Sequence, residues 1–163
     1  MTTTRTAFVT WGALIALTAA VAAGFLLLRP QPAAAQQGPL AGLESVFYKS
    51  PTCGCCNTYA EALKAAGVRL RVVDDAAATN QAKHRYGIPA QASSCHTFTL
   101  GGYVVEGHVP LEALEKLVTE RPDIDGIVLP GMPIGTPGMP GIKTAPYEIL
   151  VLQDGQLSHY LTL

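Results

Sequence analysis

Three of the four cysteines in this 163-residue chain lie within four positions, at Cys53, Cys55 and Cys56. They follow a short apolar run and a Ser-Pro-Thr turn, at the expected start of a helix. A helix N-terminus has unpaired backbone amides and the positive end of the helix dipole, which activate a thiol placed there. The spacing therefore predicts either a soft-metal site or a redox site.

Cys53 and Cys56 have the Cys-x-x-Cys spacing of a redox pair, in which Cys53 would attack and Cys56 would resolve. Cys55 does not fit that interpretation, because a third thiolate beside the pair could attack its disulfide. Thiolates select soft cations such as monovalent copper, zinc or iron–sulfur clusters. Copper(I) is the leading candidate, because a closed zinc site usually takes two paired motifs and iron–sulfur ligation typically takes four thiolates. Adjacent thiolates can also bridge more than one copper ion, and a third alternative, two structural disulfides, stays open.

A predicted hairpin brings further ligands into consideration. Cys95 and His96 lie at the start of its first strand, and His108 follows its second strand. A turn at Gly101-Gly102 would place position 96 roughly opposite position 107 or 108, because Gly-Gly can take the positive φ angles of a tight turn. Both imidazoles are therefore expected at one end of the hairpin, beside a cysteine.

The segment from Gly126 to Gly141 shows neither a helical nor a strand period and contains Pro-Gly-Met-Pro twice. A long loop without secondary structure is usually functional or disordered. One interpretation is a surface loop with a chance repeat. The other is a lid, in which Met132 and Met139 offer thioether sulfur to a soft metal.

The remaining pattern predicts an α/β domain of thioredoxin-like type, in which a βαβ unit is followed by a ββα unit, the Pro/Gly/Met loop and a C-terminal β-hairpin. The cysteine cluster would then lie at the carboxyl end of the first strand. The expected elements are strand 44–49, helix 55–66, strand 68–73, helix 76–86, strands 97–100 and 103–106, helix 111–120, and strands 147–152 and 157–161.

The N-terminal region has the composition of an export segment. Residues 7–28 carry no charge and are numerous enough to cross a bilayer. They follow Arg5 and precede a small-residue stretch with a plausible cleavage site at Ala33-x-Ala35. Residues 1–28 are thus predicted to be a signal peptide or an N-terminal membrane anchor, residues 29–42 a flexible linker, and residues 43–163 the folded domain.

The overall composition excludes one function class. Eleven Lys and Arg residues against twelve Asp and Glu residues give a formal net charge of −1. This balance provides no basic surface for nucleic acid. Residues 43–163 are also enough chain for one hydrophobic core without disulfides, so the cysteines are available for chemistry.

Four motifs in this order resemble those of the DUF411 family, the CopG type of copper-resistance metal-binding protein, and the resemblance covers residues 44–163. The motifs are Tyr48-Lys-Ser-Pro-Thr-Cys53-Gly-Cys55-Cys56, Ser94-Cys95-His96-Thr97, Gly102-Tyr-Val-Val-Glu106-Gly107-His108-Val-Pro110 and Pro130-Gly-Met132-Pro-x-Gly-x-Pro-Gly-Met139.

The resemblance implies a periplasmic thioredoxin-like protein that binds copper(I) and acts in copper resistance or homeostasis as a chaperone, buffer or redox partner. Its partners would be copper ions and other periplasmic copper-handling proteins. Oxidoreductase activity on copper or on thiols, through Cys53 and Cys56, is the alternative. The ligands implied by the resemblance are Cys53, Cys55, Cys56, Cys95, His96, His108, Met132 and Met139.

Overall fold

The computed structural model describes residues 38–163, so the predicted signal or anchor and the linker up to residue 37 lie outside the described part. No helix in residues 38–163 is both long enough and apolar enough to span a membrane. Leu40 is fully buried in the core. The packed chain therefore includes residues just before position 43.

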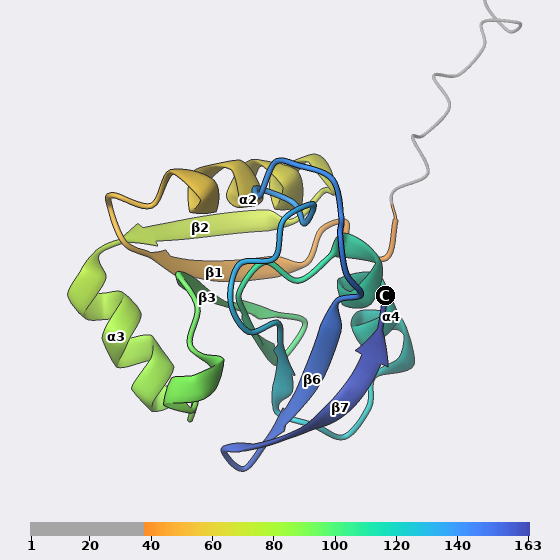
Figure 1. The fold of residues 1–163 in the computed structure, drawn as a ribbon. Helices are drawn as coiled ribbons and strands as arrows, with labels where there is room; N and C mark the ends of the chain where they lie inside the picture. Colours follow the sequence, from red (N-terminus) through yellow and green to blue (C-terminus); the bar gives the residue numbers. More distant parts are fainter. Residues whose placement is uncertain (1–37) are drawn as a thin grey trace, which may run out of the picture. The chain divides into compact units, whose positions relative to one another are not determined.

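The described residues form one seven-stranded mixed sheet with three α-helices (Figure 1), which confirms the predicted α/β class. The sheet order is β2-β1-β3-β4-β5-β6-β7. The strands are β1 Glu44–Lys49, β2 Arg69–Asp74, β3 His96–Leu100, β4 Tyr103–Glu106, β5 Gly126–Val128, β6 Glu148–Gln153 and β7 Gln156–Thr162. The helices are α2 Gly54–Ala65, α3 Ala76–Arg85 and α4 Leu111–Glu120, with a 3₁₀ helix η1 at Ala90–Ala92.

Helix α2 is held on the sheet by an apolar stripe that starts at the cysteines. Cys56, Tyr59 and Leu63 recur at helical spacing and are fully buried. They pack in the same core as Phe47 of β1, which pairs in parallel with β2. The first turn of α2 is consequently fixed at the carboxyl end of β1, as the sequence predicts.

The hairpin β3–β4 has the predicted turn and register. Gly101 and Gly102 have φ angles of +59° and +99°, and Thr97 lies opposite Glu106. The Gly107 amide donates to the His96 carbonyl oxygen over 3.1 Å. Position 96 is therefore opposite position 107, and His96 and His108 lie at the same end of the hairpin.

The segment predicted to be irregular from Gly126 begins with a strand. β5 pairs in parallel with β4 and antiparallel with β6, and its Ile127 and Val128 are fully buried. A three-residue strand covered on both faces shows no alternation of polar and apolar residues, so its sequence carries no strand period. The loop that follows starts at Leu129 and returns to β6 at Glu148.

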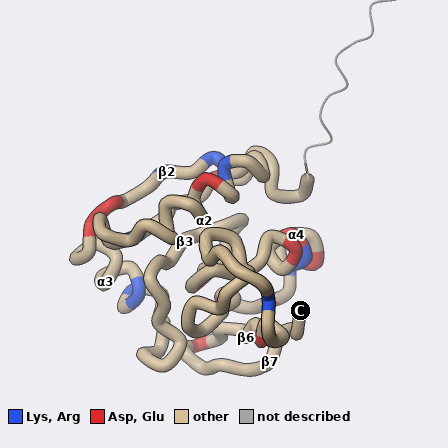
Figure 2. Tube along the Cα trace, turned by 45° about the horizontal axis from the view of Figure 1, so that its top comes forward, with Lys and Arg blue, Asp and Glu red and all other residues tan. Residues whose placement is uncertain are grey.

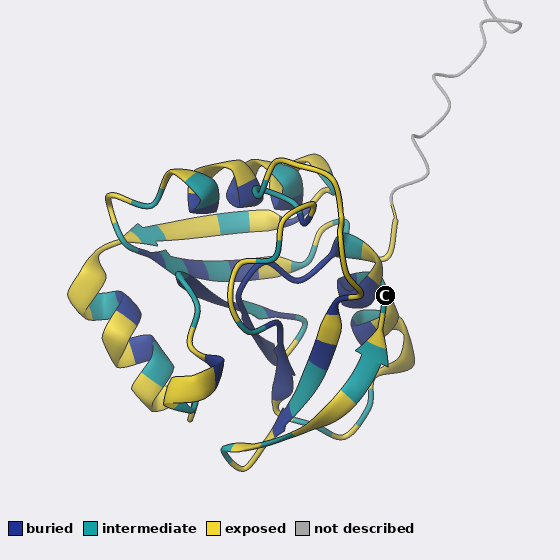
Figure 3. Cartoon of the chain, in the orientation of Figure 1, coloured by how far each residue is buried: buried dark blue, intermediate teal, exposed yellow. Residues whose placement is uncertain are grey.

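Buried residues concentrate on the central strands and on the sheet-facing sides of the helices (Figure 3). Lysines and arginines lie on separate elements, including β2, α3 and α4 (Figure 2). One lysine departs from expectation. A lysine at the end of a strand is usually solvated, but Lys49 is only 2% exposed, and its Nζ lies 2.7 Å from Asp74 Oδ1.

Candidate metal centre

The cysteine cluster occupies the first turn of α2. Cys53 is the N-cap residue, and Cys55 and Cys56 follow within the helix. The cap makes no side-chain hydrogen bond, and the first turn contains no acidic residue. The positive end of the helix dipole and the unpaired amides thus lie at the helix end that carries these cysteines.

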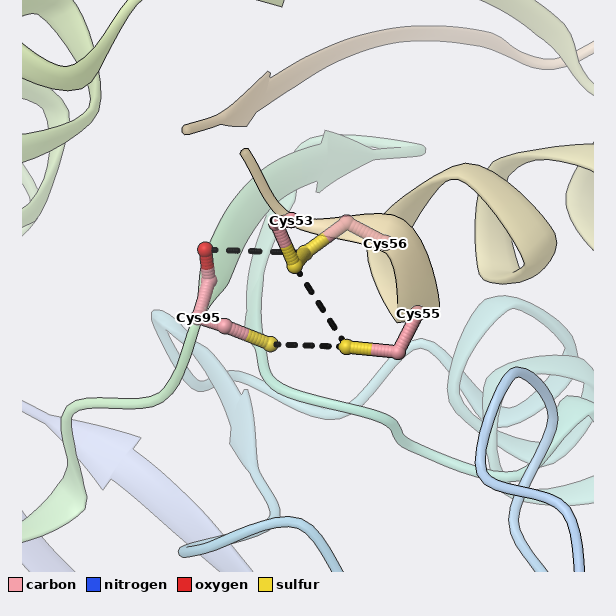
Figure 4. A group of neighbouring side chains, drawn as sticks. All are labelled: Cys53, Cys55, Cys56 and Cys95. Atoms are coloured by element: carbon pink, nitrogen blue, oxygen red, sulfur yellow. Dashed lines mark hydrogen bonds between the residues drawn. A yellow bond between two sulfur atoms is a disulfide. The ribbon is translucent and has the colours of Figure 1, made fainter. Parts of the chain in front are cut away.

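Cys53 and Cys56 are joined by a disulfide in this structure, whereas Cys55 and Cys95 are free thiols. The Cys55 Sγ atom is 3.4 Å from Cys53 Sγ and 3.9 Å from Cys95 Sγ (Figure 4). All four Sγ atoms lie within 4.8 Å of one another. The fold therefore brings Cys95, about forty residues further along the chain, into the same sulfur cluster.

Two imidazoles extend this cluster on the side of the hairpin. Cys95 Sγ is 3.3 Å from His108 Nε2 and 3.6 Å from His96 Nδ1. These three ligand atoms also lie within 4.8 Å of one another. Cys95 belongs to both groups, so its thiol connects the sulfur-rich half of the site to the imidazole half.

The tautomer of His108 follows from its second hydrogen bond. His108 Nδ1 is 2.8 Å from the Pro137 carbonyl oxygen, which can only accept. Nδ1 therefore carries the proton, and the lone pair of Nε2 faces Cys95. Burial lowers the pKa of His108, and the Pro137 hydrogen bond opposes this shift. A neutral imidazole with a free lone pair is the form that binds a metal ion.

His96 is enclosed by aromatic rings. Its ring centroid is 4.7 Å from those of Phe47, Tyr59 and His108, and its Nε2 has no hydrogen-bond partner within the described part of the chain. Burial holds the pKa of His96 well below its usual value, and the charges of His108 and Lys83 add to the effect. The ring is thus a neutral ligand candidate.

The Cys95 thiol is protonated at neutral pH when no metal is bound. Burial raises its pKa to about 11, and the neighbouring Cys55 thiol contributes to the same shift. A cation that binds Cys95 as a thiolate must therefore displace a proton.

The two methionines are placed differently. Met132 is 50% exposed, so much of its side chain faces solvent. Met139 is half-buried beside Gly138 and borders a pocket of about 340 Å³ with Thr58. Gly138 itself packs against Cys55 and His108, so the loop that carries Met139 reaches the cluster.

A buried polar network that no sequence motif indicates lies beside the cluster. The fully buried Glu106 carboxylate accepts hydrogen bonds from the Ser94 amide, the Thr97 hydroxyl and Lys83 Nζ. It therefore ties together the two segments that present Cys95 and His108. The signal in the sequence is an acidic residue at the end of an otherwise apolar hairpin strand.

Four cysteines and two histidines lie close together between a helix N-terminus and a hairpin. This arrangement is typical of α/β proteins with a thiol-based metal or redox site. The family model described as "Protein of unknown function, DUF411" matches residues 92–139. Two solved structures, titled "Copper resistance protein copG- Form 1" and "Copper resistance protein copG- Form 2", are each 36% identical to this chain. They cover 74% of this chain and 97% and 98% of their own chains, with TM-scores of 0.67 and 0.66 respectively.

The chain therefore belongs to the DUF411 family of CopG-type proteins. Among curated proteins, no match is found.

Proposed function

We propose that this protein binds copper(I) at the cluster of cysteines and histidines and acts in copper resistance or homeostasis. The observation that carries the proposal is the position of Cys95. Its Sγ atom lies 3.9 Å from Cys55 Sγ and 3.3 Å from His108 Nε2, so thiol and imidazole ligands converge. The titles of the two solved relatives, both named copper resistance proteins, support the choice of metal.

The donor set fits copper(I) better than zinc. Thiolates and neutral imidazoles suit a soft monovalent cation, and a structural zinc ion takes four ligands in a closed site. The two overlapping ligand groups that share Cys95 together offer more ligands than one zinc ion takes. We therefore expect more than one copper ion per chain, bridged by sulfur.

The proposed metal-binding form is the reduced protein. The Cys53–Cys56 disulfide must take up two electrons and two protons before both thiols are available. Metal binding then releases protons from the thiols, because the ligand is the thiolate. While the Cys53–Cys56 disulfide is present, only Cys55, Cys95 and the two imidazoles remain as metal ligands.

The proposed setting is the periplasm, reached through residues 1–28 as a cleaved signal or as an inner-membrane anchor. There the protein would act as a chaperone, buffer or redox partner for copper ions supplied by other periplasmic copper-handling proteins. We also infer a thioredoxin-like arrangement for β1 to α4. Its support is the order βαβ then ββα and the sheet order β2-β1-β3-β4.

A second candidate function is thiol–disulfide oxidoreduction. The observation that favours it is the Cys53–Cys56 bridge at the start of α2. Cys53 would attack a substrate disulfide and Cys56 would resolve the mixed disulfide, with the electrons coming from a dithiol reductant. Replacement of Cys55 by Ser separates the two functions, because the exchanger does not need this thiol.

The test is an anaerobic titration of fully reduced protein with copper(I) in the presence of a competing chelator. Wild-type protein is expected to bind more than one equivalent, and the Cys55→Ser variant to bind fewer ions while its Cys53–Cys56 disulfide still forms. His84→Ala serves as the control, because His84 is exposed on α3 away from the cluster. Reduced wild-type protein that stays empty would contradict the proposal.

A further inference from the structure

The turn formed by residues 133–141 lies directly against the cluster. The Pro137 carbonyl oxygen accepts the proton of His108 Nδ1, as described above. A Cβ atom at Gly138 would lie 2.6 Å from the Cys55 carbonyl oxygen and 3.1 Å from the His108 ring. The backbone of the turn thus approaches α2 and His108 at a distance that only glycine permits.

The turn is held in shape by its own hydrogen bonds. The Gly135 amide donates to the Met139 carbonyl over 2.8 Å, and Thr136 Oγ1 donates to the Pro133 carbonyl over 2.8 Å. The buried Tyr147 hydroxyl donates to the Ile134 carbonyl over 2.9 Å and so fixes the turn to the start of the final hairpin. The Pro137 carbonyl is therefore presented by a fixed element of structure.

We propose that this turn positions His108 for metal binding. Pro137 keeps the ring proton on Nδ1, and Gly138 allows the approach that this contact needs, so that Nε2 stays directed at Cys95. Histidine ligands commonly donate their second ring N–H to a carbonyl or carboxylate, which fixes the tautomer and the ring orientation. The effect on copper depends on the proposed function, but the tautomer is a property of the metal-free chain.

Two glycines of the same loop give a matched pair of variants. Gly138 and Gly131 have φ angles of +83° and +72°, so alanine is strained to a similar degree at both positions. A Cβ atom at Gly131 meets nothing within 4 Å, whereas one at Gly138 collides with the backbone of Cys55. Only Gly138→Ala should move the turn away from His108.

The first measurement is the histidine tautomer by ¹⁵N NMR on reduced, metal-free protein. The wild type and Gly131→Ala are expected to show His108 protonated at Nδ1, and Gly138→Ala to show a mixture of tautomers or the Nε2-protonated form. An unchanged tautomer in folded Gly138→Ala, or an Nε2-protonated ring in the wild type, would overturn the proposal.

The second measurement is copper(I) affinity in a double-mutant cycle. Gly138→Ala is expected to weaken binding roughly 10–100-fold, the usual effect of losing such an outer hydrogen bond, while Gly131→Ala binds as the wild type does. In a His108→Ala background, Gly138→Ala should cause no further loss. Additive losses, or equal losses in both glycine variants, would show that the turn does not act through His108.

Tyr147→Phe covers the case in which Gly138→Ala does not fold. It removes the hydrogen bond to Ile134 without adding volume, and we expect a smaller shift of tautomer and affinity in the same direction. No shift in either quantity would again overturn the proposal. Wild-type protein that binds no copper would reject the proposed function and leave the NMR result as the test of positioning.

Discussion

Lys83 and Glu106 form an ion pair, and Glu106 contacts the segment that carries Cys95 through the Ser94 amide. The Glu106 side chain is fully buried and that of Lys83 is 13% exposed. The carboxylate also accepts hydrogen bonds from the Ser94 amide and the Thr97 hydroxyl, so it holds the segment before β3 and the strand itself. This pair links α3 and β4 to the ligand-bearing residues.

Removing the charge of Glu106 should destabilise the domain. In Glu106→Gln, Lys83 would stay partly buried without a counter-charge, and breaking a buried pair on one side costs about 3–5 kcal/mol. Because Lys83 retains some access to water, we expect a loss of about 3 kcal/mol in the free energy of unfolding, measured by urea denaturation.

The control is Glu120→Gln, which breaks the exposed pair with Lys116 on α4. Exposed pairs are screened by solvent, so this variant should unfold at nearly the wild-type urea concentration. Equal losses in the two variants would mean that the burial of Glu106 has no energetic consequence.

Cys95→Ser should affect copper binding more broadly than any other single cysteine replacement. Cys95 is shared by the sulfur group and by the group with His96 and His108, so its loss removes ligands from both. We expect a lower copper-to-protein ratio and a smaller copper–nitrogen contribution in X-ray absorption spectra. An unchanged ratio with an unchanged nitrogen contribution would place the metal elsewhere.

Thiol labelling of protein purified in air should distinguish the cysteines. Cys55 and Cys95 are free in this structure, so alkylation of the unfolded protein without reductant should modify these two, and mass spectrometry should find the Cys53–Cys56 bridge intact. After reduction and unfolding, all four should be modified. Protein with no reactive thiol before reduction would instead support two structural disulfides.

Gly126→Ala should destabilise the sheet through a backbone collision. A Cβ atom at this position would lie 1.9 Å from the Val104 carbonyl oxygen on the paired strand β4. Overpacking of this kind typically costs about 1–3 kcal/mol, and a backbone obstacle places the effect at the upper end of that range. Thermal unfolding of the reduced protein measures the loss.

Gly54→Ala provides the comparison, because a Cβ atom at Gly54 meets nothing within 4 Å. Alanine is also the better helix former at the start of α2. This variant should be as stable as the wild type or slightly more so, and a large loss would contradict the steric explanation given for Gly126.

Local patterns identified the elements that position the site. The spacing of Tyr59, Leu63 and Ala66 on one face predicted α2, and Gly101-Gly102 predicted the hairpin register that brings His96 beside His108. These features depend on neighbours a few residues apart, which is why the sequence reveals them.

The features that the sequence does not reveal depend on contacts between distant residues. β5 is a strand only because β4 and β6 cover it on both edges, and its three residues carry no period. No local pattern marks Lys49 as buried, but the parallel pairing of β1 with β2 places it beside Asp74 in a buried position. The role of Glu106 likewise appears only when α3 supplies Lys83.

The strands β5 and β6 are hydrogen-bonded neighbours, so the Pro/Gly/Met loop leaves and re-enters the sheet at adjacent positions. Insertions, deletions or exchanges within this excursion leave the strand order intact. The sheet can accordingly keep its architecture while the loop sequence changes which side chains are offered to the cysteines.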